Sequence, residues 1–318
     1  MTQLKKNGMK KMIFAAALIV LCGCAFAQGQ GPVRGQVPNG GRAFDPDAYV
    51  ASLRETPPEN AIFLWPKDNI PTISNYTENG GSYQDDPDFQ PYMVPYLVAP
   101  GKPVKGAVMV CAGGAFLFRS NPIEGHPVAR KLAEHGYQAF VVNYRVAPFT
   151  MEEASLDLAR AVRYVRSHAQ EYGIDPYNIA AVGFSAGGIL CGDLCLNFDE
   201  YVDGTKLTFD YKPDALDKVD ASVCAVGMIY SFYGRLSHGT LNAEYLRSEH
   251  IPPTFYSYGT QDGFAPQFAA NAATARRAGA YVEEYPIEGL PHGYGLGLQG
   301  RDVWTENFNS FLEKVMNP

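Results

Sequence analysis

The sequence has no excess of positive charge. Lysine and arginine number 26, against 33 aspartates and glutamates, and the formal net charge is −7. Proteins that bind nucleic acid use basic side chains to neutralise phosphates, so this charge balance excludes nucleic acid as an expected partner. Internal repeats and heptads are lacking as well. The length of 318 residues fits one α/β domain with a short leader and surface loops.

Cysteines are few, and their spacing is not that of metal ligands. Of the six, two lie in the N-terminal segment and two, Cys111 and Cys224, lie in apolar runs. Cys191 and Cys195 lie one turn apart on an expected helix, where side chains run parallel, so a disulfide is not expected. The paired C-x-x-C spacing of a zinc site is absent. We therefore expect reduced, buried cysteines and neither a metal nor another cofactor.

A hydrophobic run long enough to span a membrane is also lacking at the N-terminus. Residues 12–21 are apolar, but a spanning helix needs roughly 20 such residues. Lysines at 5–11 precede this run, and Ala25-Phe26-Ala27 follows it as an A-x-A cleavage site. The pattern predicts a signal peptide at 1–27 and an exported protein, periplasmic or secreted. The Leu-Cys-Gly-Cys sequence ending at Cys24 also resembles a lipobox, which would instead leave a lipid anchor on that cysteine.

The remainder of the chain divides into a linker and one domain. Residues 28–47 are rich in glycine, proline and glutamine and are expected to form a flexible linker. From 48 to 318, apolar runs alternate with amphipathic stretches, which predicts a mostly parallel, doubly wound sheet with helices on both faces. The irregular stretches 198–218 and 231–250 are expected to form an insertion over the site and part of a lid. The expected strands are 60–65, 91–98, 105–111, 137–144, 178–182, 221–229, 254–258 and 282–285, and the expected helices are 127–135, 152–171, 265–278 and 302–315, with another after Ser185.

The segment around Ser185 carries the strongest chemical signal. Gly183-Phe184-Ser185-Ala186-Gly187 follows an apolar strand and precedes a helix, which is the setting that the G-x-S-x-G motif requires. The sharp turn holds the serine hydroxyl above the sheet, and the amides at the helix N-terminus suit developing negative charge. The alternative is a glycine-rich turn with a capping serine. The strand before it and the helix after it favour a nucleophile.

A serine nucleophile needs a base and an acid that orients the base. In chain order these should be serine, acid and histidine. His292 lies in a glycine-rich loop after the last expected strand, whereas the other five histidines precede the expected acid. Asp262 follows the penultimate strand, although an aspartate before glycine is also common in turns. Together these positions predict a triad of Ser185, Asp262 and His292.

Backbone amides must also face the developing oxyanion. The amide of Ala186 directly follows the nucleophile. Gly114 and Ala115 follow the strand 105–111 and would supply the others. A simple tight turn is the alternative for the glycines, and their register with the serine argues against it.

With these residues assembled, the chain resembles the alpha/beta-hydrolase esterase/lipase superfamily, and within it the acetyl-xylan-esterase-like branch called BD-FAE. The resemblance implies Ser185 as nucleophile, His292 as base, Asp262 as its partner, and oxyanion amides at Gly114, Ala115 and Ala186. One departure is that the family usually has three glycines and a tyrosine at the positions of 113–116, where a β-carbon at 115 strains the backbone if φ is positive. The motifs lie at 111–116, 124–130, 140–148, 157–163, 174–176, 183–188, 259–262 and 292–293.

The resemblance implies a secreted serine carboxylester hydrolase that removes acetyl or other small acyl groups from carbohydrates. The expected partner is therefore a small-molecule or oligosaccharide ester. Two alternatives stay open. One is a feruloyl esterase or serine peptidase on the same fold. The other is a binding module without catalysis, since a fold does not dictate function.

Overall fold

The computed structural model describes residues 53–316 apart from 82, 200–203, 237 and 297–301. The expected signal peptide at 1–27 and linker at 28–47 lie outside the described residues, as does the start of the expected domain at 48. Within the part that the structure describes, no helix is long and apolar enough to cross a membrane.

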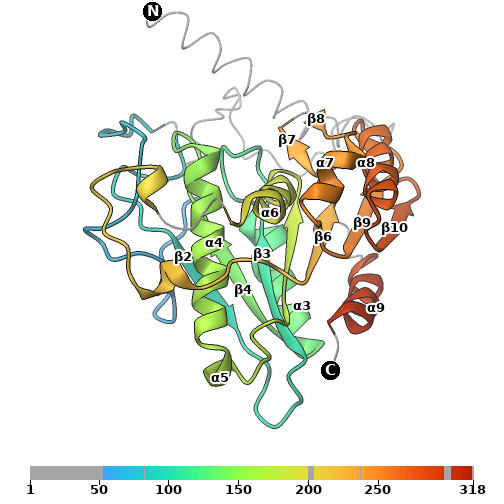
Figure 1. The fold of residues 1–318 in the computed structure, drawn as a ribbon, viewed down its shortest axis with the longest axis horizontal. Helices are drawn as coiled ribbons and strands as arrows, with labels where there is room; N and C mark the ends of the chain where they lie inside the picture. Colours follow the sequence, from blue (N-terminus) through green and yellow to red (C-terminus); the bar gives the residue numbers. More distant parts are fainter. Residues whose placement is uncertain (1–52, 82, 200–203, 237, 297–301, 317–318) are drawn as a thin grey trace, which may run out of the picture.

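Eight strands form one sheet in the order β1-β2-β4-β3-β5-β6-β9-β10, which Figure 1 shows from β2 at the left to β10 at the right. β1 pairs antiparallel with β2, and β2 antiparallel with β4, while every other pair is parallel. The predicted α/β fold with a mostly parallel sheet is confirmed. The strands are β1 (Ile62–Phe63), β2 (Tyr92–Tyr96), β3 (Gly106–Cys111), β4 (Tyr137–Asn143), β5 (Ile179–Phe184), β6 (Ala225–Ile229), β9 (Thr254–Gly259) and β10 (Val282–Ile287).

Helices cover both faces of this sheet, and the core is divided accordingly. Along β3, Met109 and Cys111 pack into one buried cluster with side chains of α4 and α6, whereas Val108 and Val110 pack into another with α3 and α9. Burial on both faces explains why the strands read as continuous apolar runs rather than alternating ones. The helices are α3 (His126–Glu134), α4 (Met151–Ser167), α5 (Ala169–Tyr172), α6 (Ala186–Asn197), α7 (Ala243–Ser248), α8 (Ala265–Ala278) and α9 (Thr305–Val315).

The carboxyl ends of the parallel strands bring distant segments to one edge of the sheet. The loop 112–118 follows β3, Ser185 follows β5, Asp262 follows β9 and His292 follows β10. Backbone pairing holds these strands in register; Cys111 of β3, for example, pairs with Gly183 of β5. The topology therefore places all four predicted site segments at the same rim.

Some predicted elements differ from the observed ones. β1 spans only Ile62–Phe63 instead of 60–65, because it lies between two turns, one closed by Ala61 N and Pro58 O and the other by Asn69 N and Pro66 O. The stretch 231–250 forms a hairpin of β7 (Gly234–Arg235) and β8 (His238–Gly239), followed by α7, which packs against α8.

The described part of 198–218 contacts helix α4 and the segment around Trp65. Asp214 and Asp217 bind Arg160 of α4, and the ring of Tyr211 meets Trp65 edge-on at 5.6 Å. These contacts place the stretch against α4, and the expectation that it covers the site stays a prediction.

Candidate active site

Ser185 lies on a sharp turn between β5 and α6, with φ of 49° and ψ of −118°. L-residues rarely adopt a positive φ, so this conformation is strained and is held by close packing. A Cβ on Gly183 would lie 2.2 Å from the carbonyl oxygen of Gly187, and a Cβ on Gly187 would lie 2.1 Å from that of Cys111. Both glycines are therefore required for the helix to fold back over the strand ends.

The structure brings Ser185, His292 and Asp262 together. His292 Nε2 lies 2.9 Å from Ser185 Oγ, and His292 Nδ1 lies 2.6 Å from Asp262 Oδ2. The Asp262 side chain is fully buried, and that of His292 is 13% exposed. A neutral imidazole that donates from Nδ1 to the carboxylate can accept the serine proton at Nε2. This geometry allows Ser185 to act as a nucleophile, His292 as its base and Asp262 as the acid that orients the base.

The acid and histidine loops fix one another through the backbone. Gln261 N donates to Leu290 O at 3.0 Å, and Asp262 Oδ1 accepts from Phe264 N at 2.8 Å. The imidazole is flanked by the rings of Phe264 and Phe268, with centroids 6.0 and 6.4 Å away. Both groups are thus placed by short-range contacts within a largely apolar wall.

The loop 112–118 faces the serine from β3. A Cβ on Gly113 would lie 3.0 Å from Ser185 Cβ, so the two backbones are in contact. Ala115 and Phe116 both have positive φ, 54° and 57°. The β-carbon at 115 therefore strains the backbone, as expected for a residue other than glycine in this conformation. Among the described residues, none accepts a hydrogen bond from the amides of Gly114, Ala115 or Ala186. These amides are therefore available to a ligand oxygen.

Three of the remaining histidines are engaged elsewhere. His126 contacts Tyr96 and Glu55, His135 lies 3.4 Å from Glu306, and the ring of His168 stacks on Tyr164 at 4.0 Å. None of these contacts involves Ser185.

Two residues of the site escaped prediction as functional groups. Glu124 is buried, and its carboxylate accepts hydrogen bonds from Gly113 N at 2.7 Å and from Tyr230 Oη at 2.6 Å. Burial raises the pKa of Glu124 and of Tyr230. Glu124 appeared in the sequence only as part of a family motif, and Tyr230 carried no signal, because the two are 106 residues apart in the chain.

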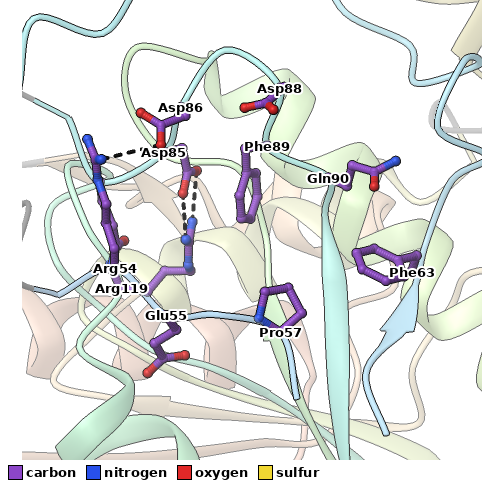
Figure 2. A pocket seen from close by; sticks show the side chains of 11 residues that line it. Arg54, Glu55, Pro57, Phe63, Asp85, Asp86, Asp88, Phe89, Gln90 and Arg119 are labelled. Atoms are coloured by element: carbon purple, nitrogen blue, oxygen red, sulfur yellow. Dashed lines mark hydrogen bonds and ion pairs between the residues drawn. The ribbon is translucent and has the colours of Figure 1, made fainter. Parts of the chain in front are cut away.

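A pocket of about 270 Å³ lies beside Arg119, which directly follows the loop 112–118. None of the three triad residues lines it. Figure 2 shows two ion pairs in its wall, Arg119 with Asp85 and Arg54 with Asp86. Arg119 Nη1 also donates to Tyr144 O at 2.6 Å. Arg119 directly follows Phe118, so its contacts with Asp85 and Tyr144 anchor this end of the loop 112–118.

A mostly parallel eight-stranded sheet, with a serine on a strand–helix turn and an acid and a histidine after later strands, defines the alpha/beta-hydrolase fold. Residues 96–236 match the family model BD-FAE, which confirms the recognition drawn from the motifs.

The acetylxylan esterase of Xylanibacter ruminicola is 24% identical over 73% of this chain and 50% of the relative. Endo-1,4-beta-xylanase B of Butyrivibrio fibrisolvens is 29% identical over 51% of this chain and 28% of the relative. The chain thus spans half or less of these curated relatives. Among solved structures, the acetyl ester-xyloside bifunctional hydrolase of Caldicellulosiruptor lactoaceticus is 25% identical, with a TM-score of 0.61, and covers 81% of this chain and 95% of that one.

Proposed function

We propose that this protein is a serine hydrolase of carboxylic esters that removes acetyl or other small acyl groups from carbohydrates. The observation that carries the proposal is the continuous hydrogen-bonded chain from Ser185 Oγ through His292 to Asp262. The amides of Gly114, Ala115 and Ala186 also support the proposal, because ester hydrolysis needs donors that stabilise negative charge on the carbonyl oxygen. The names of the curated relatives, an acetylxylan esterase and a xylanase, favour a polysaccharide ester as substrate.

In the proposed mechanism, His292 Nε2 takes the proton of Ser185 Oγ as the oxygen attacks the ester carbonyl carbon. The carbonyl oxygen becomes negatively charged and accepts hydrogen bonds from the amides of Gly114, Ala115 and Ala186. Asp262 stabilises the imidazolium without taking its proton. Each oxyanion donor contributes about 3–4 kcal/mol of transition-state stabilisation.

The tetrahedral intermediate then collapses. The bond from the carbonyl carbon to the sugar oxygen breaks, and the imidazolium of His292 donates its proton to that leaving oxygen. The acyl group remains on Ser185. Water then attacks the acyl-enzyme with the same histidine as base, and the carboxylic acid is released with the hydroxyl of Ser185 restored.

The proposal is tested with purified wild type and Ser185→Ala on a fluorogenic acetate, acetylated xylan, methyl ferulate and a peptide amide. We expect wild type to hydrolyse the acetate and release acetate from xylan, with at most slow turnover of ferulate and amide. We expect Ser185→Ala to lose activity by about 10⁴-fold or more. Equal rates for the two proteins on every substrate would exclude this mechanism, and ferulate as the best substrate would reassign the acyl group.

We propose further that the chain is exported through its N-terminal segment. The basic residues at 5–11, the apolar run at 12–21 and the A-x-A site before Gln28 support cleavage there. Intact mass of the exported protein tests the alternatives, because cleavage gives an N-terminal Gln28 and lipidation gives a diacylglyceryl mass on Cys24. A protein that retains residues 1–27 after export would contradict both.

A further inference from the structure

Glu124 joins two loops of the proposed active site. It belongs to a π-helical turn, Asn121–Gly125, that directly precedes α3. Its Oε2 accepts from the amide of Gly113, at the start of the loop that holds the oxyanion amides. Its side chain is buried, and it lies 11 residues from Gly113 along the chain. The carboxylate thus fixes the residue immediately before Gly114 and Ala115.

The other carboxylate oxygen reaches the histidine loop through a tyrosine. Glu124 Oε1 accepts from Tyr230 Oη, and Tyr230 Oη in turn accepts from Gly295 N at 3.1 Å. The Tyr230 ring also lies 4.9 Å from the ring of His292, centroid to centroid. Tyr230 itself has a positive φ of 39° and directly follows β6.

The π-helical turn contacts the same loop directly as well. Leu296 N donates to Ile123 O at 2.8 Å, and a Cβ on Gly295 would lie 2.9 Å from that oxygen. A single turn of chain therefore touches the oxyanion loop on one side and the histidine loop on the other. Ala115 and Phe116 are strained, so the oxyanion loop needs such an anchor to keep its amides in place.

We propose that Glu124 is a positioning residue that couples the oxyanion loop to the histidine loop through Tyr230. It does not touch the substrate; it holds two groups that do. This inference rests on the proposed function. A displacement of about 1 Å in a preorganised site lowers the rate of the chemical step by about 10²-fold, so a defect in this link falls on kcat rather than on substrate binding.

The test compares Glu124→Gln and Tyr230→Phe with two matched controls. Asp217 is also a buried carboxylate that accepts from a tyrosine hydroxyl, Tyr211 Oη at 2.8 Å, and from a backbone amide, Asp214 N at 2.7 Å. Asp217→Asn and Tyr211→Phe therefore remove the same kinds of bonds away from the triad, and Asp217→Asn also removes the ion pair with Arg160. Each variant is measured for kcat and KM on an acetate ester, for the rate of labelling by a fluorophosphonate, and for Tm.

We expect Glu124→Gln to lower kcat and the labelling rate by about 10–100-fold, with KM within about 3-fold. Tyr230→Phe should lower kcat by about 5–10-fold, and the double variant should be no slower than Glu124→Gln alone, because both break one chain of bonds. The two controls should lose at least as much Tm, because Asp217→Asn also breaks the ion pair with Arg160, while kcat stays within about 2-fold. Tyr230→Phe keeps the ring and carries the test if Glu124→Gln does not fold.

Two outcomes would overturn the inference, and they are distinguishable. If wild type is labelled and Glu124→Gln is labelled equally fast, Glu124 is a structural residue only and the proposed function stands. If wild type itself is neither labelled nor active, the proposed function fails and the inference fails with it.

Discussion

Ala115 is the first of two consecutive residues with a strained backbone in the loop that faces Ser185. Its φ of 54° is followed by a φ of 57° at Phe116. Each L-residue in the left-handed region costs about 1–2 kcal/mol relative to glycine. The strain persists because the loop is anchored on both sides, by Gly113 to Glu124 and by Arg119 to Asp85.

Ala115→Gly should therefore stabilise the fold. Removal of the Cβ relieves the strain, while glycine adds about 0.4–1 kcal/mol of unfolded-state entropy, which leaves a net gain of about 0.5–1 kcal/mol. Urea unfolding measures it. Ala133→Gly, in the last turn of α3, is the control and should lose stability, by at most about 1 kcal/mol. If Ala115→Gly loses as much stability as Ala133→Gly, the backbone at Ala115 is not strained.

Asp262→Asn should leave the fold intact and remove most of the activity. The amide can donate to His292 Nδ1, which favours the tautomer with a proton on Nε2, and this tautomer cannot accept the serine proton. We expect kcat on an acetate ester to fall by about 10³–10⁴-fold. Asp217→Asn serves again as the buried-carboxylate control. Retention of more than about a tenth of wild-type kcat would mean that Asp262 does not orient the base.

At the scale of elements, α6 depends on its approach to β3. Gly187 faces Cys111 O and Ala112 O, which would lie 2.1 and 2.6 Å from a new Cβ. Both are backbone atoms and cannot rotate away. Gly187→Ala should therefore destabilise the protein by about 3 kcal/mol or more, or prevent folding. Circular dichroism with urea measures this. Gly80→Ala, which meets nothing within 4 Å, should be nearly neutral, and equal stability of the two variants would contradict the close contact.

The N-terminus of α4 makes stability depend on pH. Glu153 closes a capping box with Thr150, and its carboxylate also accepts from Ile73 N and from the side chain of Ser74. Burial alone would raise the pKa of Glu153, but hydrogen bonds from Ser74, Thr150 and Thr72, with Arg145 nearby, hold it below the ordinary 4.5. Glu153 thus ties the loop 72–74 to the helix most strongly while it is ionised.

Because the folded-state pKa is depressed, this contribution is fully present above about pH 4.5 and is lost as pH falls through the folded-state pKa. Glu153→Gln should cost about 1–3 kcal/mol at pH 7 and should reduce the fall in unfolding free energy between pH 4.5 and lower pH. Urea titrations from pH 3 to 7 measure both effects. A variant whose stability falls as steeply below pH 4.5 as that of wild type would assign the dependence to other carboxylates.

At the scale of the whole molecule, the sequence predicted what depends on strand order and local pattern. Ser185, Asp262 and His292 were predicted because each follows a strand of the expected parallel sheet, and parallel strands end at one edge. The structure places the three side chains within hydrogen-bond distance. The predicted helix 265–278 coincides with α8, whose Pro266 near the start and Gly279 at the end are local signals.

What the sequence did not reveal depends on contacts between distant segments. The link from Glu124 to Tyr230 joins residues 106 apart, and no periodicity records such a pair. The contacts of 204–218 with Arg160 and Trp65 are likewise tertiary. The hairpin of β7 and β8 is only two residues per strand, too short to produce an alternating pattern.

The central claim is that Ser185 forms a covalent intermediate with His292 as its base. Intact-protein and peptide mass spectrometry after reaction with a fluorophosphonate tests it most directly, on wild type, Ser185→Ala and His292→Ala. We expect one adduct per chain on the peptide that contains Ser185, none on Ser185→Ala, and labelling of His292→Ala slower by about 10³-fold or more. An adduct on another residue, or equal labelling of wild type and Ser185→Ala, would contradict the account.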